Sequence, residues 1–233
     1  MRSHTLTVVT VALTCSLTSS LTAQTGVDPS GHWQGSVSSP RGEMRFELDL
    51  QKNDTGELAG TVDVPAQNIA GLPLREVIVQ GRKIEFNART DQAFRGDLAA
   101  DGHAMAGTFT IEGNALPFTL ARTGEARIRP VAKGTAIAKA LEGEWQATLP
   151  SSGMRLQLKL STDGDGSRAV LVNLDEGGLQ LPAVWTQHDS SVVLDFPAVG
   201  GSFAATLNAD ATELTGTYSQ AGKSVDLTFN RRR

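Results

Sequence analysis

The stretch Met44-Arg45-Phe46-Glu47-Leu48-Asp49-Leu50 alternates apolar and polar side chains at every step. Successive side chains of a β-strand point to opposite faces, so this period of two predicts a half-buried strand and not a helix. The stretch returns as Met154-Arg155-Leu156-Gln157-Leu158-Lys159-Leu160, with the same apolar face. The chain therefore carries the same kind of strand twice, and each copy must bury one face.

Other segments repeat in the same order along the 233 residues. The offset between matched positions falls only from 112 to 109 residues, which small loop deletions explain. The further matched segments are 31–35 with 143–147, 72–73 with 181–182, 94–98 with 203–207, 105–109 with 214–218, and 118–122 with 227–231. A repeat of this period predicts two tandem units, residues 31–122 and 143–233, joined by a linker at 123–142.

Turn signals such as those at 53–56, 101–102 and 163–166 separate about eight short strands in each unit. Antiparallel strands with one apolar face protect that face and their edges by closing on themselves. We therefore expect an all-β protein with two small up-and-down barrels, lipocalin-like or flattened. The helix-favouring composition of 135–141 predicts a short helix or one helical turn in the linker.

The N-terminal segment 1–23 has the pattern of a secretory signal peptide. Arg2 precedes an apolar stretch at 6–13, and Ala23 is a small residue at the expected cleavage point. The apolar stretch is far shorter than the roughly 20 residues of a membrane-spanning helix. We expect an exported bacterial protein, periplasmic or extracellular, with 24–30 as a short tail. Lipidation at Cys15, the only cysteine, is the alternative.

Composition and motifs argue against several classes of function. The net charge is −4, and no basic stripe with interleaved aromatic residues marks a nucleic-acid site. No Gly-x-Ser-x-Gly string occurs, and Asp163-Gly164-Asp165-Gly166 lacks the later ligands of a calcium loop. We therefore expect no catalytic residues, no metal site and no cofactor.

Four residues occupy matched places in the two units and are candidate ligand-binding residues: Trp33, Trp145, Arg45 and Arg155. The tryptophans begin the first strand of each unit, where a place in the core or barrel floor is the alternative to a ligand platform. The arginines fall on the polar face, where pairing with an acidic residue across the strands is the alternative.

Three histidines follow the signal segment, His32, His103 and His188, and they lack the spacing of metal ligands. No histidine position is shared between the two units. We expect all three at the surface or at strand ends.

A set of motifs together resembles one known kind of domain. They are Gly-x-Trp-x-Gly at 31–35, Met-Arg-x-x-Leu-x-Leu at 44–50 and 154–160, Leu-Pro at 72–73 and 181–182, Leu-x-Ala-Asp at 207–210, and Leu-Thr-Gly-Thr-Tyr at 214–218. Both units are similar to the small β-rich domain that precedes the catalytic domain of exported bacterial, acidobacterial-type α/β-hydrolases. The resemblance implies export and an accessory role. We expect the hydrolase domain, with its catalytic residues, to be absent.

These observations favour an exported, non-catalytic binding or accessory protein that contacts a small ligand, a polysaccharide or a protein partner. Two alternatives stay open. One is a hydrolase-like enzyme with a non-standard site between the two units. The other is a structural or protein-interaction module of the envelope that works with a separately encoded hydrolase.

Overall fold

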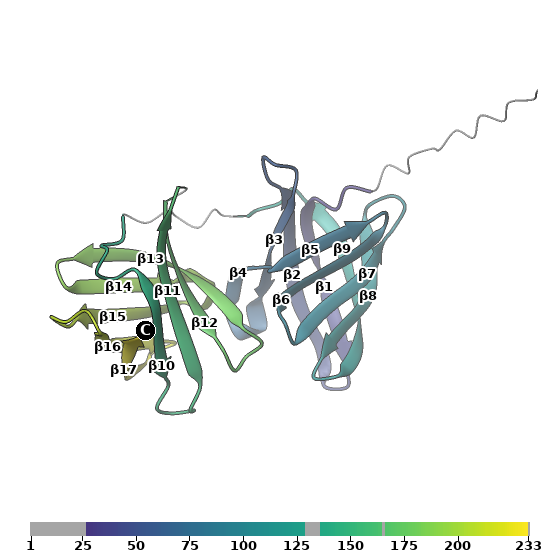
Figure 1. Ribbon diagram of the computed structural model, residues 1–233. Helices are drawn as coiled ribbons and strands as arrows, with labels where there is room; N and C mark the ends of the chain where they lie inside the picture. The colour runs from purple at the N-terminus through teal and green to yellow at the C-terminus, as the bar shows by residue number, and fades with distance from the viewer. Residues whose placement is uncertain (1–26, 129–135, 165, 233) are drawn as a thin grey trace, which may run out of the picture.

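The computed structural model describes residues 27–128, 136–164 and 166–232. The predicted signal peptide, Cys15, residues 24–26 of the predicted tail and part of the linker lie outside these residues. The described residues form β-strands and two short 3-10 turns, which confirms the all-β expectation. Figure 1 shows two curled sheets side by side, the N-terminal one and the C-terminal one. No helix in the described part of the chain is long and apolar enough to span a membrane.

The N-terminal sheet has nine antiparallel strands in the order β4-β3-β2-β1-β9-β8-β7-β6-β5. Its first and last strands in the sequence, β1 and β9, are therefore neighbours within the sheet. The strands are β1 (Gly31–Ser39), β2 (Gly42–Lys52), β3 (Leu58–Val64), β4 (Ile69–Pro73), β5 (Glu76–Gln80), β6 (Lys83–Arg89), β7 (Gln92–Leu98), β8 (Ala104–Ile111) and β9 (Asn114–Gly124), with the turn η1 (Pro65–Gln67) before β4.

The C-terminal sheet is a closed barrel in which eight strands follow one another in sequence order. Pairing of β10 with β17, through Trp145 with Arg231 and Gln146 with Asn230, completes the circle. The strands are β10 (Gly143–Thr148), β11 (Arg155–Asp163), β12 (Gly166–Asn173), β13 (Leu179–His188), β14 (Ser191–Phe196), β15 (Gly201–Leu207), β16 (Glu213–Gln220) and β17 (Lys223–Arg231), with the turn η2 (Pro197–Val199) before β15.

The two sheets share their register at the matched positions. Trp33 pairs with Leu48 in the first, and Trp145 pairs with Leu158 in the second. The last strands agree as well, because the backbone N–H of Arg122 and of Arg231 each donates to the carbonyl before the penultimate strand, at 2.9 Å.

The expectation of eight strands in a closed barrel is met by the second sheet and is wrong for the first. In the barrel, β13 passes without a break from its partner β12, at Ala183, to its partner β14, at Val184. In the first sheet the chain makes the same passage between β4 and β5 outside regular strand. There the N–H of Leu74 donates to Gly60 at 2.9 Å and the N–H of Arg75 donates to Asn87 at 2.8 Å.

The side chain of Leu74 gives the physical reason for this interruption. It lies over Gly60, where an added Cβ would come within 2.7 Å of Leu74 Cδ1. The barrel has two small residues, Ala169 and Ala183, as a direct pair at the corresponding place. In the first sheet Leu74 thus packs over Gly60 where the barrel has the strand pair Ala169 and Ala183. As a result β4 and β5 are separate edge strands.

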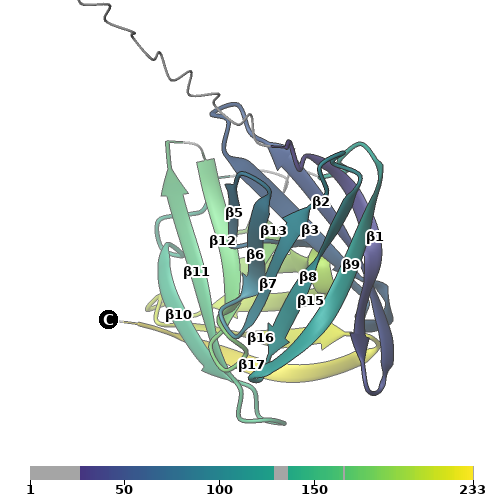
Figure 2. The same ribbon diagram turned by 90° about the vertical axis from the view of Figure 1, so that its right-hand side faces the viewer.

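The two sheets contact each other where β4 meets η2, where β13 meets β4 and β6, and through hydrogen bonds of the turn between β12 and β13. The carbonyl of Gly177 accepts hydrogen bonds from Thr90 N at 2.9 Å and Thr90 Oγ1 at 3.0 Å, and the carbonyl of Gly178 accepts one from Arg75 Nη1 at 3.2 Å. Gly177 has a φ of +56°, and a Cβ there would lie 2.1 Å from Asp91 Oδ1. Figure 2 views the molecule with the N-terminal sheet in front of the barrel.

Of the short helix or single helical turn expected at 135–141, the described part, 136–141, has no helix and one turn, closed by Leu141 N and Ala138 O at 2.8 Å. The backbone N–H groups before this turn bond to side chains of the barrel. Ile137 N donates to Ser167 Oγ at 3.0 Å, and Ala138 N donates to Gln187 Oε1 at 3.2 Å. The end of the linker therefore packs on the barrel, with the side chain of Ile137 buried.

Candidate functional site

The interior of the N-terminal sheet is filled by phenylalanine side chains. Ring centroids of neighbouring rings are 4.3 to 6.4 Å apart, which is within the range of favourable aromatic packing. The rings are Phe46, Phe86, Phe94, Phe109 and Phe118. This interior is a packed core and not a ligand chamber.

The interior of the C-terminal barrel is packed in the same way. The gaps that remain among its apolar side chains are too narrow for a water molecule. Tyr218 lines them and directs its hydroxyl to Gln220 at 3.1 Å, and burial raises the pKa of this phenol. An eight-stranded barrel is wide enough for either side chains or one small ligand, and here side chains take the space.

The predicted candidates Trp33 and Trp145 are fully buried in separate sheets. The indole N–H of Trp33 donates to Pro29 O, and that of Trp145 donates to Leu141 O, both at 2.9 Å. The guanidinium carbon of an arginine lies over each ring, at 4.9 Å for Arg122 over Trp33 and at 4.2 Å for Arg231 over Trp145. Both rings are covered, so neither presents a face to a ligand.

The predicted candidates Arg45 and Arg155 lie exposed on different sheets and are not brought together. Arg155 pairs with Asp175, Nη2 to Oδ1, at 2.5 Å, and this hydrogen bond lowers the pKa of the Asp175 carboxyl. For Arg155 the structure thus provides an acidic partner on the surface.

His32 is buried at the start of β1, so it takes the strand-end place that was expected as the alternative to a surface position, whereas His103 and His188 are exposed. His32 Nδ1 lies 2.8 Å from Asp49 Oδ1, and Nε2 lies 3.3 Å from Glu47 Oε2. The N–H of Arg127 also donates to Asp49 Oδ1, at 2.8 Å, so the start of the linker covers this cluster.

The matching place in the barrel has the acidic residue on the first strand and the basic one on the second. There Glu144 stands at the position of His32, and Lys159, 3.4 Å away, stands at that of Asp49. The pair is half exposed, whereas His32 and Asp49 are buried. Among the described residues, no group of three His, Cys, Asp or Glu side chains is placed to hold a metal ion.

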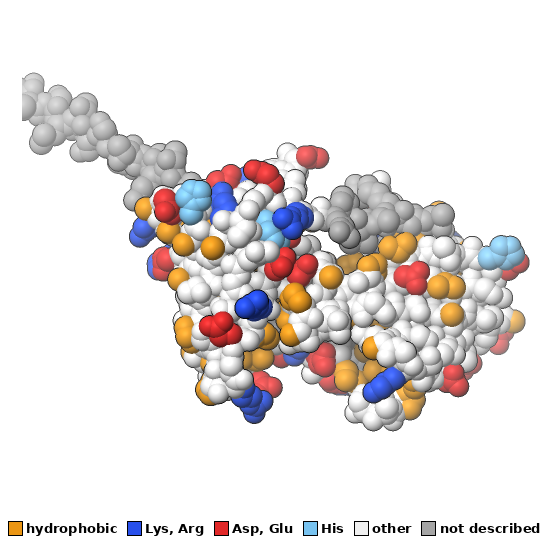
Figure 3. Space-filling model, turned by 180° about the vertical axis from the view of Figure 1, so that it is seen from behind, with side chains coloured by type: hydrophobic (Ala, Val, Ile, Leu, Met, Phe, Trp, Pro, Cys, Tyr) orange, Lys and Arg blue, Asp and Glu red, His pale blue; other side chains and the backbone are white. Residues whose placement is uncertain are grey.

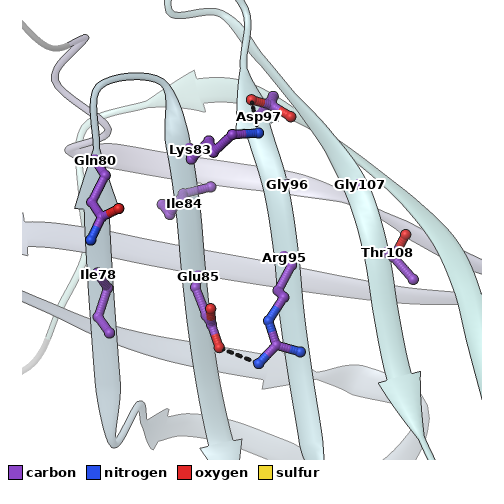
Figure 4. A pocket seen from close by; sticks show the side chains of 10 residues that line it. All are labelled: Ile78, Gln80, Lys83, Ile84, Glu85, Arg95, Gly96, Asp97, Gly107 and Thr108. Atoms are coloured by element: carbon purple, nitrogen blue, oxygen red, sulfur yellow. Dashed lines mark hydrogen bonds and ion pairs between the residues drawn. The ribbon is translucent and has the colours of Figure 1, made fainter. Parts of the chain in front are cut away.

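A hollow of about 470 Å³ lies on the outer face of the N-terminal sheet, across β5, β6, β7 and β8. Two ion pairs flank it (Figure 4). Lys83 Nζ lies 3.5 Å from Asp97 Oδ1, and Arg95 Nη2 lies 2.5 Å from Glu85 Oε1. We refer to this feature as the outer groove.

The floor and ends of the outer groove follow from strand register. Ile84 pairs with Gly96, and Gly96 with Gly107, so the row between the two ion pairs has its one side chain, that of Ile84, buried on the inner face. On the outer face this row presents peptide backbone. Ile78 and Gln80 of β5 lie at one end and Thr108 of β8 lies at the other.

The corresponding place in the barrel has no charges. Where the first sheet pairs Lys83 with Asp97, the barrel pairs Ser191 with Thr206. Where the first sheet pairs Glu85 with Arg95, the barrel pairs Val193 with Ala204. The outer groove therefore belongs to one unit only.

The lining of the outer groove consists of exposed backbone, paired charged side chains and a few neutral ones. Of the described residues that line it, none is a histidine, serine or cysteine. Its charged side chains are largely exposed, and each is already paired within the groove. Such a surface can donate and accept hydrogen bonds but offers no activated nucleophile.

The spacing of charged residues in the sequence indicates this site, but the comparison of matched positions in the two units did not bring it out. Lys83 and Asp97 are equally far from Thr90, and so are Glu85 and Arg95. A hairpin turning at Thr90 therefore places both pairs opposite each other on its polar face. Comparison between the units favoured what they share, and the outer groove is what they do not share.

No known protein family matches the chain, and no curated protein matches it. Two solved structures have related arrangements at low similarity. One is a "putative outer membrane protein" from Bacteroides fragilis, with 11% identity, a TM-score of 0.28, and coverage of 87% of this chain and 97% of that one. The other is a protein of unknown function from Nostoc punctiforme, of the DUF3598 family, with 14% identity, a TM-score of 0.25, and coverage of 88% and 96%.

Proposed function

We propose that this chain is an exported, non-catalytic binding protein made of two copies of one lipocalin-like barrel unit. Its ligand binds on the outer groove of the first unit and not inside a barrel. The observation that carries the proposal is the contrast between two filled interiors and a hollow of about 470 Å³ outside them. Small-molecule sites have volumes of about 300 to 1,000 Å³, which includes this value.

The duplication and the barrel type rest on matched features of the two sheets. Both place a tryptophan under an arginine of the last strand, and both pair that tryptophan's strand with the last one. The strand order of the second sheet is that of an up-and-down barrel, the arrangement of lipocalins. One unit supplies the binding surface, and the other packs against it through η2, β13 and the turn that carries Gly177 and Gly178.

The accessory role rests on the resemblance to the small domains of exported bacterial hydrolases. In this proposal the protein binds material on which a separately encoded hydrolase acts. Binding without turnover is what an accessory domain contributes.

The test uses the full chain and a residue that closes the outer groove. Thr108→Trp places a large side chain at one end of the groove, and Thr217→Trp does the same at the matched position of the barrel. Immobilised protein is exposed to xylan, polygalacturonate, chitosan and a casein digest. We expect binding of one probe to be lost in Thr108→Trp and kept in Thr217→Trp.

Two results would overturn the proposal. One is binding that Thr108→Trp leaves unchanged for every probe that binds. The other is turnover of p-nitrophenyl acetate or casein by the purified full chain. Circular dichroism of both variants verifies that each is folded before binding is compared.

A further inference from the structure

We infer that the outer groove takes an uncharged, polyhydroxylated chain, a neutral oligosaccharide, lying across β5 to β8. This inference rests on the proposed function and specifies the ligand class of that site. It is argued from the layout of charge, the groove floor and the free apolar surface.

The four charges of the outer groove alternate in sign. Along β6 the order is Lys83 and then Glu85, and along β7 the facing order is Asp97 and then Arg95. The charges cancel, and each has its counter-ion at 3.5 or 2.5 Å. A polyanion or polycation that approaches one side chain therefore meets the opposite charge beside it, and gains little from the site as a whole.

A hydroxyl group suits this layout because it both donates and accepts. It can donate to the carboxylate of an ion pair while it accepts from the ammonium or guanidinium group of the same pair. Hydrogen bonds to charged groups are about twice as strong as those between neutral groups. The amide of Gln80 and the hydroxyl of Thr108 extend the same mixed chemistry to both ends.

The floor disfavours a peptide as the occupant. Peptides are recognised through an unpaired strand edge or through pockets that take alternate side chains. The strands β6, β7 and β8 are paired on both sides, and the one unpaired edge among the four groove strands, that of β5, is the edge away from β6 and from the groove floor. The row of Ile84, Gly96 and Gly107 presents backbone on its outer side, so no side chain of this row divides the hollow into separate pockets for alternate side chains.

One apolar side chain, Ile78, is 46% exposed at the end of the outer groove. It offers a surface for the carbon face of a sugar ring. The four strands span about 14 Å at the usual spacing of about 4.8 Å, which is room for a short oligomer.

Figure 3, which shows the molecule from behind, has charged side chains of both signs scattered over that face and not gathered by sign.

The experiment titrates the full chain, labelled for NMR, with cellohexaose and xylohexaose as neutral probes. An oligogalacturonate and a chitosan oligomer are the anionic and cationic probes. Lys83→Ala/Asp97→Ala and Glu85→Ala/Arg95→Ala each remove one ion pair. Ser191→Ala/Thr206→Ala, at the matched positions of the barrel, is the control.

We expect a neutral probe to shift resonances of β5 to β8. Each groove double variant should raise its Kd at least tenfold, and the control should change it less than twofold. Raising the salt from about 0.05 M to about 0.5 M should also change the Kd less than twofold, because no net charge is neutralised. Exposed ion pairs contribute little to stability, so the variants should stay folded.

The outcomes separate the two proposals. If the charged oligomers bind in the outer groove and the neutral ones do not, the inference is wrong and the proposed function stands. If no neutral probe shifts the resonances of β5 to β8 at about 10 mM, the inference is also wrong. If a probe binds and neither groove variant weakens it, the inference and the proposed function both fail.

Discussion

Replacing Arg231 with methionine removes the side chain that connects the last strand of the barrel to the Trp145 ring and to three backbone carbonyls. The guanidinium lies 4.2 Å from the centre of the Trp145 ring and donates to the carbonyls of Glu142 at 2.6 Å, Ala211 at 2.7 Å and Ala140. Hydrogen bonds to charged groups contribute about 1.5 to 3 kcal/mol when buried, and a cation–π contact about 0.5 to 2 kcal/mol. Even the lower values sum to about 5 kcal/mol for three bonds and one ring contact, and because solvent screens this partly exposed side chain we expect a loss of about 3 kcal/mol.

The same replacement at Arg122 should cost less, although the two arginines are matched in sequence. Arg122 lies 4.9 Å from the centre of the Trp33 ring and donates through Nη2 to Asp28 O alone. Its Nε is buried without a hydrogen-bond partner among the described residues, which offsets part of what the side chain contributes. We expect a loss of about 1 kcal/mol, since one bond and a longer ring contact are removed.

Urea unfolding followed by tryptophan fluorescence measures both losses. The difference of about 2 kcal/mol corresponds to a factor of roughly 30 in the unfolding equilibrium. Arg45→Met, at an exposed position, is the control and should stay within about 0.5 kcal/mol of the parent chain. The reasoning is refuted if Arg122→Met costs as much as Arg231→Met, or if Arg231→Met costs less than about 1 kcal/mol.

Three further predictions concern the buried cluster and the contact between the sheets. His32→Leu leaves the buried carboxylate of Asp49 without its imidazole partner, so unfolding free energy should fall by about 3 kcal/mol in urea titrations; a loss below about 1 kcal/mol would contradict this. Gly177→Val places a β-branched residue at a φ of +56°, which glycine adopts readily and valine does not, and its Cβ would displace the Asp91 side chain, so the turn should lose its bonds to Thr90 and small-angle scattering should show a larger radius of gyration; an unchanged radius would count against the contact. The hydrogen bond from Arg89 lowers the pKa of Asp91. The stability that the ionised Asp91 contributes to the folded protein is therefore complete above the unfolded pKa of about 3.9, and it is lost as the pH falls through the lower folded pKa. The same scattering measurement should show separation only below about pH 4, and separation that begins near pH 6 would exclude Asp91 as its cause.

Local patterns predicted the strands well because each depends on its own residues. The alternation at 44–50 assigned Phe46, Leu48 and Leu50 to the core, and all three are buried. The pairing of Trp33 with Leu48 is consistent with that assignment, because directly paired residues on neighbouring strands point to the same face of the sheet, here the buried one. The repeated segments also predicted the order of the strands in each unit.

Features that depend on contacts between residues far apart in the chain could not be predicted from the sequence. The break between β4 and β5 arises because Leu74 packs over Gly60, and this pair is recognisable only once the strands are in register. The burial of His32 depends on the linker chain that bonds to Asp49, and that chain is 78 residues away. The alignment of Arg122 with Arg231 was visible, but their stacking on tryptophan was not.

The pairing of first and last strands has a mechanical consequence. In the N-terminal sheet His32 lies opposite Gly124, and in the barrel Trp145 lies opposite Arg231, so both chain ends of each sheet leave from the same end. A pulling force on those ends loads the backbone hydrogen bonds one after another, as in a zipper, and never all at once. The seam of the barrel pairs only Trp145 with Arg231 and Gln146 with Asn230, whereas the seam of the first sheet runs from His32 to Val37. Under tension the barrel should therefore peel open first, while the sheet that carries the outer groove keeps its shape.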